Sequence, residues 1–276
     1  MPRAGARRRA VGGDRRELRR RFHGHLHDVW SRLALSIPGG WVEEAGALTC
    51  IATGSSSPSF NLALASGARG DPREALDAAR DRFSGAGLRW LLKLQPDLDH
   101  EVVVHARRRG LDLDEEPVYW MPIRPGAATA PLSSAAPLSV SVAGRDTIDD
   151  AVLCFAEAFD ADADAVSREL GPNLLTIPTF TVFVGYLSGE PVASSMLAAT
   201  RSVGLAGVYS VATRPDHRGR GFGTALTAAA LAEAAQQGCD TAVLEPSPSG
   251  APMYRRMGFE PLTTYLEAVI SPHDGP

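Results

Sequence analysis

Three glycines within five residues mark the part of the sequence best suited to do chemistry. Gly219, Gly221 and Gly223 precede a long alanine-rich stretch that is typical of a helix. Because glycine has no Cβ, such a run lets several backbone N–H groups point into one concavity. A helix that begins there adds unpaired N–H groups and the positive end of its dipole. With the cationic side chains of Arg218 and Arg220, the segment predicts a binding site for a pyrophosphate group.

Two common nucleotide-binding loops do not fit these residues. A dinucleotide-binding turn requires the pattern G-x-G-x-x-G directly after a strand. Here position 224 is threonine, and five residues separate the preceding apolar run from Gly219. A P-loop requires a lysine before its serine or threonine, and the segment contains no lysine. A glycine-rich surface turn without a ligand remains the alternative to a pyrophosphate site.

The segment follows the pattern Arg-x-x-Gly-x-Gly, and a second motif, Tyr-Arg-Arg-Met-Gly-Phe at residues 254–259, comes after a predicted helix and strand. With both motifs, residues 138–271 resemble the GNAT superfamily of acyl-CoA-dependent N-acetyltransferases. The resemblance implies a mixed α/β (α+β) fold in which helices flank a mostly antiparallel sheet. It also implies acetyl-CoA as co-substrate and no metal.

The resemblance assigns the cofactor contacts to the glycine loop and to the strand before it. In that fold this strand splays from its neighbour, and free backbone groups at Val211 and Thr213 would bind the pantetheine arm. The loop from Gly219 to Thr224 would hold the pyrophosphate. Many relatives carry asparagine where this chain has Ser247, whose hydroxyl retains one of the amide's two contacts. The implied set is Val211, Ala212, Thr213, Arg218, Gly219, Arg220, Gly221, Phe222, Gly223, Thr224 and Ser247.

Tyr254 is the candidate general acid. With Ser249 as N-cap, Pro252 falls in the first turn of a short helix and Gly258 lies just past its end. The resemblance puts Tyr254 near the sulfur of the cofactor, where a phenol can protonate the departing CoA thiolate. The alternative is a core tyrosine that packs against Phe259.

A general base is needed as well, because an amine acceptor arrives as an ammonium ion and must lose a proton. Glu245 ends the central strand, two residues before Ser247, and is the candidate. The competing interpretation is a charged residue at a strand end. His217 precedes the glycine loop and is expected to be a solvated loop residue.

The elements that must position these residues follow one another through the second half of the chain. Short apolar runs alternate with helix-like stretches, and Ser188-Gly-Glu-Pro191 between two runs indicates a hairpin. This order describes a mixed α/β domain with a mostly antiparallel sheet. The expected strands are Leu138–Val142, Phe180–Leu187, Val192–Ala199, Leu205–Thr213, Asp240–Leu244 and Leu262–Ile270, and the expected helices are Thr147–Phe159, Asp160–Leu170, Thr224–Gln237 and Ala251–Met257.

The first half repeats part of this order without its chemistry. The motif at residues 107–111 echoes the one that follows Tyr254, but Ala106 takes the place of the tyrosine. The loop in place of the glycine run holds Asp71, which repels phosphate, and Pro72, which has no N–H. We therefore expect two GNAT-like units in tandem, the first degenerate, with an unrelated α/β domain as the alternative. The expected strands are Ala47–Ala52, Phe60–Ala65, Leu88–Leu94 and Val118–Ile123, and the expected helices are Pro72–Phe83 and Asp99–Arg109.

The composition of the chain distinguishes a basic N-terminal arm and a linker from the two units. Its 276 residues are 44% hydrophobic and carry a net charge of −4, which is ordinary for a protein with a buried core. Residues 1–21 hold nine arginines and predict a basic, disordered arm, for which nucleic-acid binding is the competing role. The Pro-, Ala- and Ser-rich residues 125–137 predict a linker. The expected domains are a degenerate unit at 22–124 and a catalytic unit at 138–276.

Three cysteines at wide spacing fit neither a disulfide framework nor a zinc cluster, and they predict a cytoplasmic protein. No apolar run reaches the roughly 18 residues of a membrane span, so no membrane partner is expected. We expect an N-acetyltransferase whose acceptor amine, on a small molecule or peptide, attacks the thioester directly; a nucleic-acid partner is not expected. A CoA-binding sensor or structural protein without turnover is the alternative.

Overall fold

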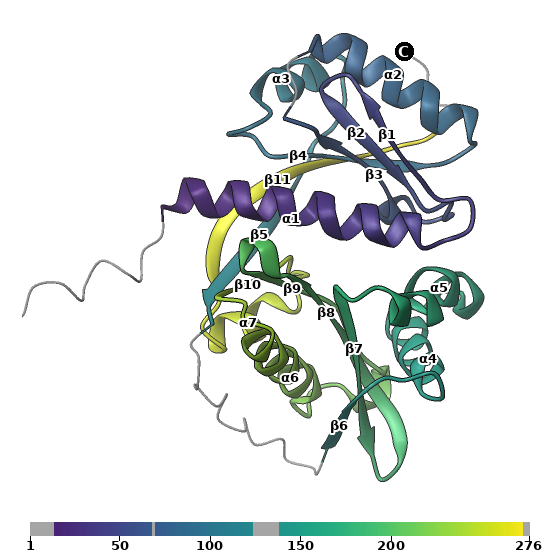
Figure 1. Ribbon diagram of the computed structural model, residues 1–276, viewed down its shortest axis with the longest axis vertical. Coiled ribbons are helices and arrows are strands. Elements are labelled where there is room, and N and C mark those ends of the chain that lie inside the picture. Colours follow the sequence, from purple (N-terminus) through teal and green to yellow (C-terminus); the bar gives the residue numbers. More distant parts are fainter. Residues whose placement is uncertain (1–13, 68–69, 124–137, 273–276) are drawn as a thin grey trace, which may run out of the picture.

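The computed structural model describes residues 14–67, 70–123 and 138–272, which form one continuous sheet flanked by helices (Figure 1). The order of its eleven strands is β1-β2-β3-β4-β11-β5-β10-β9-β8-β7-β6. Neighbouring strands are antiparallel except in the pairs β3/β4 and β9/β10, which confirms the expected mixed, mostly antiparallel fold. The strands are β1 (Trp41–Ala45), β2 (Leu48–Ala52), β3 (Asn61–Ala65), β4 (Trp90–Leu94), β5 (Asp114–Pro122), β6 (Leu138–Val142), β7 (Phe180–Leu187), β8 (Glu190–Thr200), β9 (Leu205–Thr213), β10 (Thr241–Leu244) and β11 (Glu260–Ile270).

Helices cover both faces of the sheet in the second half of the chain. Two of them, α4 and α5, pack on one face, and α6 and α7 pack on the other (Figure 1). None of the helices in the described ranges is long and apolar enough to cross a membrane. The helices are α1 (Arg15–Leu35), α2 (Pro72–Gly85), α3 (His100–Arg108), α4 (Ile148–Phe159), α5 (Ala163–Leu170), α6 (Phe222–Gln236) and α7 (Ala251–Arg256).

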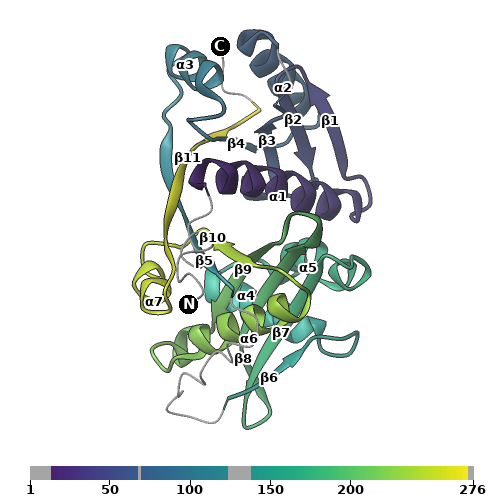
Figure 2. The ribbon, with the colours of Figure 1, turned by 60° about the vertical axis from the view of Figure 1, so that its left-hand side comes forward.

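The two halves of the chain exchange one strand each. Strand β5, from the first half, lies between β10 and β11, while β11, from the second half, lies between β5 and β4. Both strands pair antiparallel with their neighbours. Figure 2 shows β5 and β11 side by side as they pass from one half of the molecule to the other. The expected linker, residues 125–137, lies outside the described residues, but the units before and after it are not separate in space.

The two halves repeat one topology. The order β1-β2-β3-β4-β11-β5 in the first half mirrors β7-β8-β9-β10-β5-β11 in the second. In each half a helix, α2 or α6, links the two parallel strands. The expected tandem of two similar units is thus confirmed. Their helix N-termini differ, because the Asp71 carboxylate caps α2 by accepting a hydrogen bond from the backbone N–H of Arg73, 2.8 Å away.

Helix α1 takes the place of part of the expected disordered arm. Residues 15–21 form its first turns, and only residues 1–13 of that arm lie outside the described residues. The physical reason is an apolar stripe with helical spacing, which the many arginines obscure in the sequence. Its buried members are Leu18, Phe22, Leu26, Val29 and Leu33.

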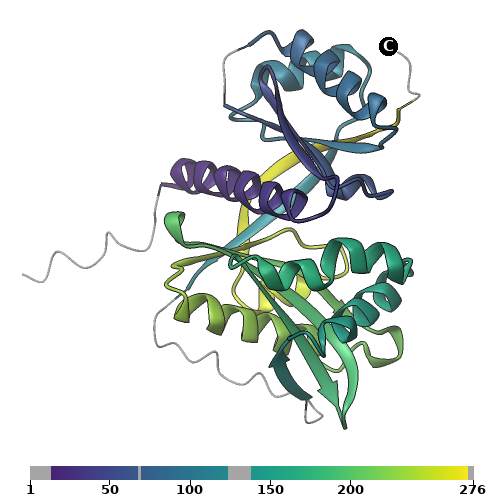
Figure 3. The ribbon, with the colours of Figure 1, turned by 45° about the vertical axis from the view of Figure 1, so that its right-hand side comes forward.

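The same helix joins the two halves. Figure 3 shows α1 lying across the molecule between them. Its Phe22 ring meets Tyr265 of β11 edge-on, with centroids 5.7 Å apart, and the Arg21 guanidinium donates to the Asp240 carboxylate just before β10, at 2.8 Å. The apolar contacts of α1 with both halves stabilise the exchanged arrangement.

His25 is buried in the interface that α1 makes with the second half. Its Nδ1 lies 2.8 Å from the Thr200 hydroxyl and its Nε2 lies 3.0 Å from the Tyr209 hydroxyl. Burial lowers the pKa of His25 to about 3, because no carboxylate compensates the lost hydration of the cation. The His25 and Tyr209 rings together explain Gly207, where a Cβ would stand 2.2 Å from Tyr209 Cε2 and 2.6 Å from His25 Nε2.

We expect His25 to make the protein sensitive to acid. Between pH 6.5 and 3 the unfolded chain binds a proton on this histidine that the folded chain does not bind, so the free energy of unfolding falls as the pH falls. The slope is at most about 1.4 kcal/mol per pH unit. Chemical unfolding between pH 7 and 5 should show a shallower slope for His25→Gln than for wild type. The exposed His100→Gln should keep the wild-type slope, and equal slopes for all three proteins would contradict the assignment.

Candidate functional site

Strands β9 and β10 separate after a short parallel contact. Pairing extends only from Leu205 to Gly207 of β9, and from Val208 onward that edge of β9 has no strand partner among the described residues. A bulge against β8 accompanies the separation, with Ser210 at a φ of 52°. The splay predicted from the family resemblance is therefore present, and Val211 and Thr213 lie on the open part of β9.

The loop after β9 leads into the N-terminus of α6. Gly219 and Gly221 have φ values of 76° and 84°, which side chains with a Cβ rarely adopt. Among the described residues, no backbone N–H from Gly219 to Thr224 donates a hydrogen bond to the protein. The three first-turn N–H groups of a helix have no internal acceptor, so this terminus can accept an anion. Gly223 serves packing, since a Cβ there would lie 3.3 Å from the Met253 sulfur of α7.

The side chains expected around this loop fall into two groups, arginines that bind backbone carbonyls and apolar side chains that are buried in the core. Arg218 donates to the backbone carbonyls of Thr213 and Ala158, at 3.2 and 2.6 Å, and Arg220 donates to the carbonyl of Asp216 at 3.2 Å. Both arginines thus fix the loop to its surroundings. The side chains of Ala212 and Phe222 are buried in the core, so these two residues offer only their backbone.

A cleft of about 740 Å³ opens where β9 and β10 separate. Four residues singled out by sequence line it together: Val211, Glu245, Ser247 and Tyr254. The first half of the chain contributes part of the wall through a serine-rich loop before β3 and through Glu116 of β5. The remaining lining residues include Ser55, Ser57, Phe60, Phe155, Phe159, Asp162, Glu169, Val208, Tyr209 and Ser210.

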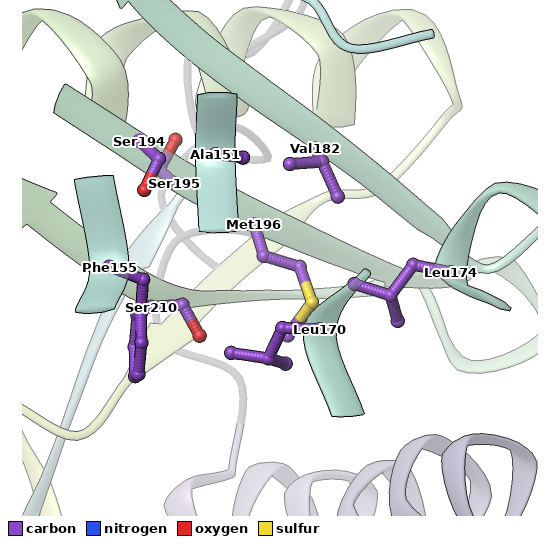
Figure 4. A pocket seen from close by; sticks show the side chains of 9 residues that line it. All are labelled: Ala151, Phe155, Leu170, Leu174, Val182, Ser194, Ser195, Met196 and Ser210. Atoms are coloured by element: carbon purple, nitrogen blue, oxygen red, sulfur yellow. The ribbon is translucent and has the colours of Figure 1, made fainter. Parts of the chain in front are cut away.

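A much smaller pocket of about 20 Å³ lies behind one wall of the cleft, under α4 and α5. Figure 4 shows its mainly apolar side chains, with Phe155 beside Ser210. These two residues line both the small pocket and the cleft. The small pocket has room for a single water molecule, so the larger cleft is the candidate substrate site.

Tyr254 lies in α7 at the edge of the cleft. Its ring packs edge-on against Phe259, with centroids 5.7 Å apart, and the side chain is 8% exposed. Burial raises the pKa of Tyr254 to about 12, and a hydrogen bond with the Thr227 hydroxyl opposes that rise. Tyr254 therefore has the packing of a core residue and also faces the cleft as a protonated phenol.

The cap of α7 differs from the expected one. Gly250, and not Ser249, is the N-cap residue. The hydroxyl of Ser247 accepts a hydrogen bond from the Gly250 N–H at 3.2 Å, and the helix begins at Ala251, which is the expected first residue. Pro252 lies in the first turn as predicted, and Gly258 follows the helix with a φ of 99°.

Glu245 is held by a charge from the other half of the chain. Lys93 of β4, the one lysine of the sequence, forms ion pairs with both Glu245 and Glu267 of β11. Burial raises the pKa of Glu245, and Lys93 opposes that effect. The expected general base is thus part of a buried ion-pair network.

Glu116 is the residue that sequence reasoning missed. It lies half-buried in the cleft wall, and its pKa is raised to about 7, first by burial and then by Glu267 and Glu245. It comes from β5, more than 100 residues before the motifs of the second half. Nothing in its local sequence could have placed it there, because only the strand exchange brings it into the site.

Comparison with known proteins agrees with this geometry. Residues 147–259 match the model of the acetyltransferase (GNAT) family. No curated protein sequence matches the chain.

Similar solved structures extend the likeness to nearly the whole chain. A GCN5-related N-acetyltransferase from Kribbella flavida is 22% identical, with 93% of this chain and 95% of that chain covered at a TM-score of 0.71. A GCN5-related N-acetyltransferase from Sphaerobacter thermophilus is 15% identical, with coverage of 83% and 78% and a TM-score of 0.57. A tandem GNAT protein from the clavulanic acid biosynthesis pathway is 15% identical, with coverage of 84% and 80% and a TM-score of 0.58. The fold is therefore that of tandem GNAT proteins, and residues 147–259 form a domain of the acetyltransferase (GNAT) family.

Proposed function

We propose that the protein is an N-acetyltransferase that moves the acetyl group of acetyl-CoA to a primary amine on a small molecule or peptide. The observation that carries the proposal is the splay of β9 from β10, which joins a helix terminus with free N–H groups to a cleft that contains Tyr254. The match of residues 147–259 to the acetyltransferase (GNAT) family supports acyl transfer from an acyl-CoA in general.

The residues present fit acetyl-CoA. The N–H groups from Gly219 to Thr224 would hold the pyrophosphate, and the open edge of β9 at Val211 and Thr213 would bind the pantetheine arm. The Ser247 hydroxyl faces the cleft and would add one hydrogen bond. A backbone N–H near Val211 would polarise the thioester carbonyl, as in an oxyanion hole.

Direct attack by the amine suits the nucleophiles that this chain offers. All three cysteines, Cys50, Cys154 and Cys239, are free and buried. Burial raises the pKa of Cys50 and of Cys154 to about 12 and raises that of Cys239 as well, so none of them is a thiolate ready to form an acyl-enzyme. Free buried thiols also support the proposal of a cytoplasmic protein.

We expect one acetyl-CoA per chain. In the second half the N-terminus of α6 is open, with Gly221 as its N-cap. In the first half the Asp71 carboxylate occupies the corresponding terminus of α2, where it would repel a phosphate. The first half would then serve as scaffold and as one wall of the acceptor site.

A change at Thr224 should test the cofactor site without damage to the fold. Thr224 is the third residue of α6, where glutamate favours a helix through the dipole and through capping. We expect Thr224→Glu to melt no lower than wild type and to bind CoA at least tenfold more weakly, which is about 1.4 kcal/mol. Thr224→Gln, of the same shape but neutral, should bind nearly normally. Calorimetric titration measures both, and wild-type affinity in Thr224→Glu would contradict the site.

A thiol-release assay tests the activity itself. Wild-type protein and acetyl-CoA are incubated with aliphatic monoamines, diamines, amino sugars and short peptides with a free N-terminus. Release of CoA thiol together with an acetylated amine supports the proposal. A CoA-binding sensor, for which Ser247 in the place of asparagine is the supporting observation, would bind CoA calorimetrically and release none.

A further inference from the structure

Lys93 is a buried cation that forms ion pairs with two carboxylates, and one of these, Glu245, lines the cleft. Lys93 is 4% exposed, and its Nζ forms ion pairs with Glu245 and Glu267 and lies 5.2 Å from the centroid of the Tyr265 ring. Register explains the pair with β11, because Glu267 lies directly opposite Lys93. One positive charge therefore already compensates two negative charges.

Glu116 adds a third carboxylate to the same face of the sheet. It lies directly opposite Tyr265, and Tyr265 and Glu267 share a face because they are two residues apart on β11. On its other side β5 pairs with β10 as far as Leu244, the residue before Glu245. Among the described residues, Glu116 makes no ion pair or hydrogen bond, and its side chain lines the cleft with Tyr254.

Within the described ranges, this third carboxylate has no ion-pair partner of its own. Burial, Glu267 and Glu245 all favour its protonated form, and Lys93 opposes them only in part, so its pKa lies near 7. A carboxylate of this kind is stabilised by a proton or by a cation that enters the cleft. Glu245, by contrast, already has a cation beside it, because it forms an ion pair with Lys93.

The rest of the cleft wall has the same sign of charge. Its ionisable carboxyl groups are Glu116, Asp162, Glu169 and Glu245, and within the described residues no lysine, arginine or histidine lines it. Three charged groups act on the Glu116 carboxyl: Lys93 on β4, Glu245 after β10 and Glu267 on β11. Tyr265 of β11 lies opposite Glu116, and its hydroxyl is 3.2 Å from Nδ1 of His23 on α1. The other titratable side chains of the cleft wall are Asp162, Glu169, Tyr209 and Tyr254.

We infer that Glu116, supplied by the first half of the chain, is the general base that deprotonates the acceptor, and that the acceptor binds the cleft as an ammonium cation. This inference rests on the proposed acetyl transfer. Under this inference the first half of the chain, which is not proposed to bind acetyl-CoA, contributes Glu116 to the reaction. Lys93, Glu245 and Glu267 would be positioning residues, because they set the electrostatic environment of Glu116.

The proposed step is balanced in protons and electrons. The ammonium group passes one proton to the Glu116 carboxylate, and the free amine nitrogen attacks the thioester carbon to form a C–N bond. The C–S bond then breaks, its electron pair goes to sulfur, and the sulfur takes a proton from the Tyr254 phenol. The second proton on nitrogen returns to Tyr254, and Glu116 releases its proton to water.

Kinetics of Glu116→Gln test the inference with the amine that wild type acetylates fastest. General-base catalysis contributes about 10²–10⁴-fold, so kcat should fall by that order with a smaller change in the KM for acetyl-CoA. The wild-type kcat/KM should rise with pH through about 7, and this acidic limb should be absent from Glu116→Gln. Glu116→Asp should recover part of the rate. The neighbouring Glu115→Gln, whose side chain is exposed, should behave as wild type.

A second readout is independent of turnover. In protein labelled with ¹³C at the glutamate carboxyl carbon, one resonance should titrate near pH 7, vanish in Glu116→Gln and persist in Glu115→Gln. A wild-type rate and acidic limb in Glu116→Gln, or no resonance that titrates near 7, would overturn the inference. Absence of acetylation of any amine by wild type would instead overturn the proposed function, while the resonance would still report on Glu116.

Discussion

Replacement of Tyr254 by phenylalanine is expected to lower kcat by about 10²–10⁴-fold, with CoA affinity close to that of wild type. The phenol is the protonated group that the second motif brings into the cleft, and its pKa of about 12 keeps it protonated throughout the working pH range. Phenylalanine keeps the edge-on contact with Phe259 and removes only the hydroxyl. A lower rate in a variant that keeps this packing would therefore identify Tyr254 as a general acid, because a residue with only a packing role would leave the rate unchanged.

The measurement is single-turnover acetyl transfer, so that chemistry and product release are resolved. Tyr186→Phe is a matched control, because Tyr186 of β7 donates to the Asp150 carboxylate at 2.6 Å and does not line the cleft. Because the pKa of Tyr254 is high, no alkaline limb from this group should be seen below pH 11. An unchanged single-turnover rate in Tyr254→Phe would make it a packing residue.

Separation of the two halves should have the largest effect on folding. A fragment of residues 138–276 lacks β5, so β10 and β11 lose the strand that lies between them, and it also lacks α1. Unpaired strand edges and exposed apolar surface of this extent favour aggregation over a native fold. We expect this fragment alone to show no cooperative melting and no CoA binding.

The two fragments together should behave differently. Co-expression of residues 1–124 with 138–276 should restore a folded, CoA-binding complex, because the exchanged strands can pair again. Full-length protein cut by a protease at a site inserted within residues 125–137 is the control, and it should keep its halves associated during gel filtration. A soluble fragment 138–276 that melts cooperatively and binds CoA would contradict the structural role of β5.

Much of the local structure could be predicted from the sequence. The strands Leu138–Val142, Phe180–Leu187 and Leu205–Thr213 have the expected bounds, because apolar runs between turn residues define them locally. Strand β1 and helix α1 were not predicted. The apolar spacing from Leu18 to Leu33 carries the signal for α1, but the arginines between these positions dominate the composition.

Pairing between distant strands could not be predicted. The apolar patterns of β5 and β11 indicate that each is a strand, but a pattern of buried residues does not specify the neighbour across the sheet. For the same reason Glu245 and Tyr254 could be recognised from nearby motifs, whereas Glu116 could not. The arginines of the loop show another limit, because the motif indicates a positive charge at Arg218 but not the two backbone carbonyls to which its guanidinium donates.

The exchange of β5 and β11 has a consequence for how this protein can change over evolutionary time. A unit that contributes no ligand site of its own would ordinarily be free to change in sequence or to be lost. Here each unit completes the sheet of the other. A destabilising mutation in the core around Trp90 would therefore disturb β11, and through β11 it would disturb the residues of the cleft. Selection on the second unit therefore also preserves the fold of the first. The two units form one cooperative structure, so their sequences are constrained together.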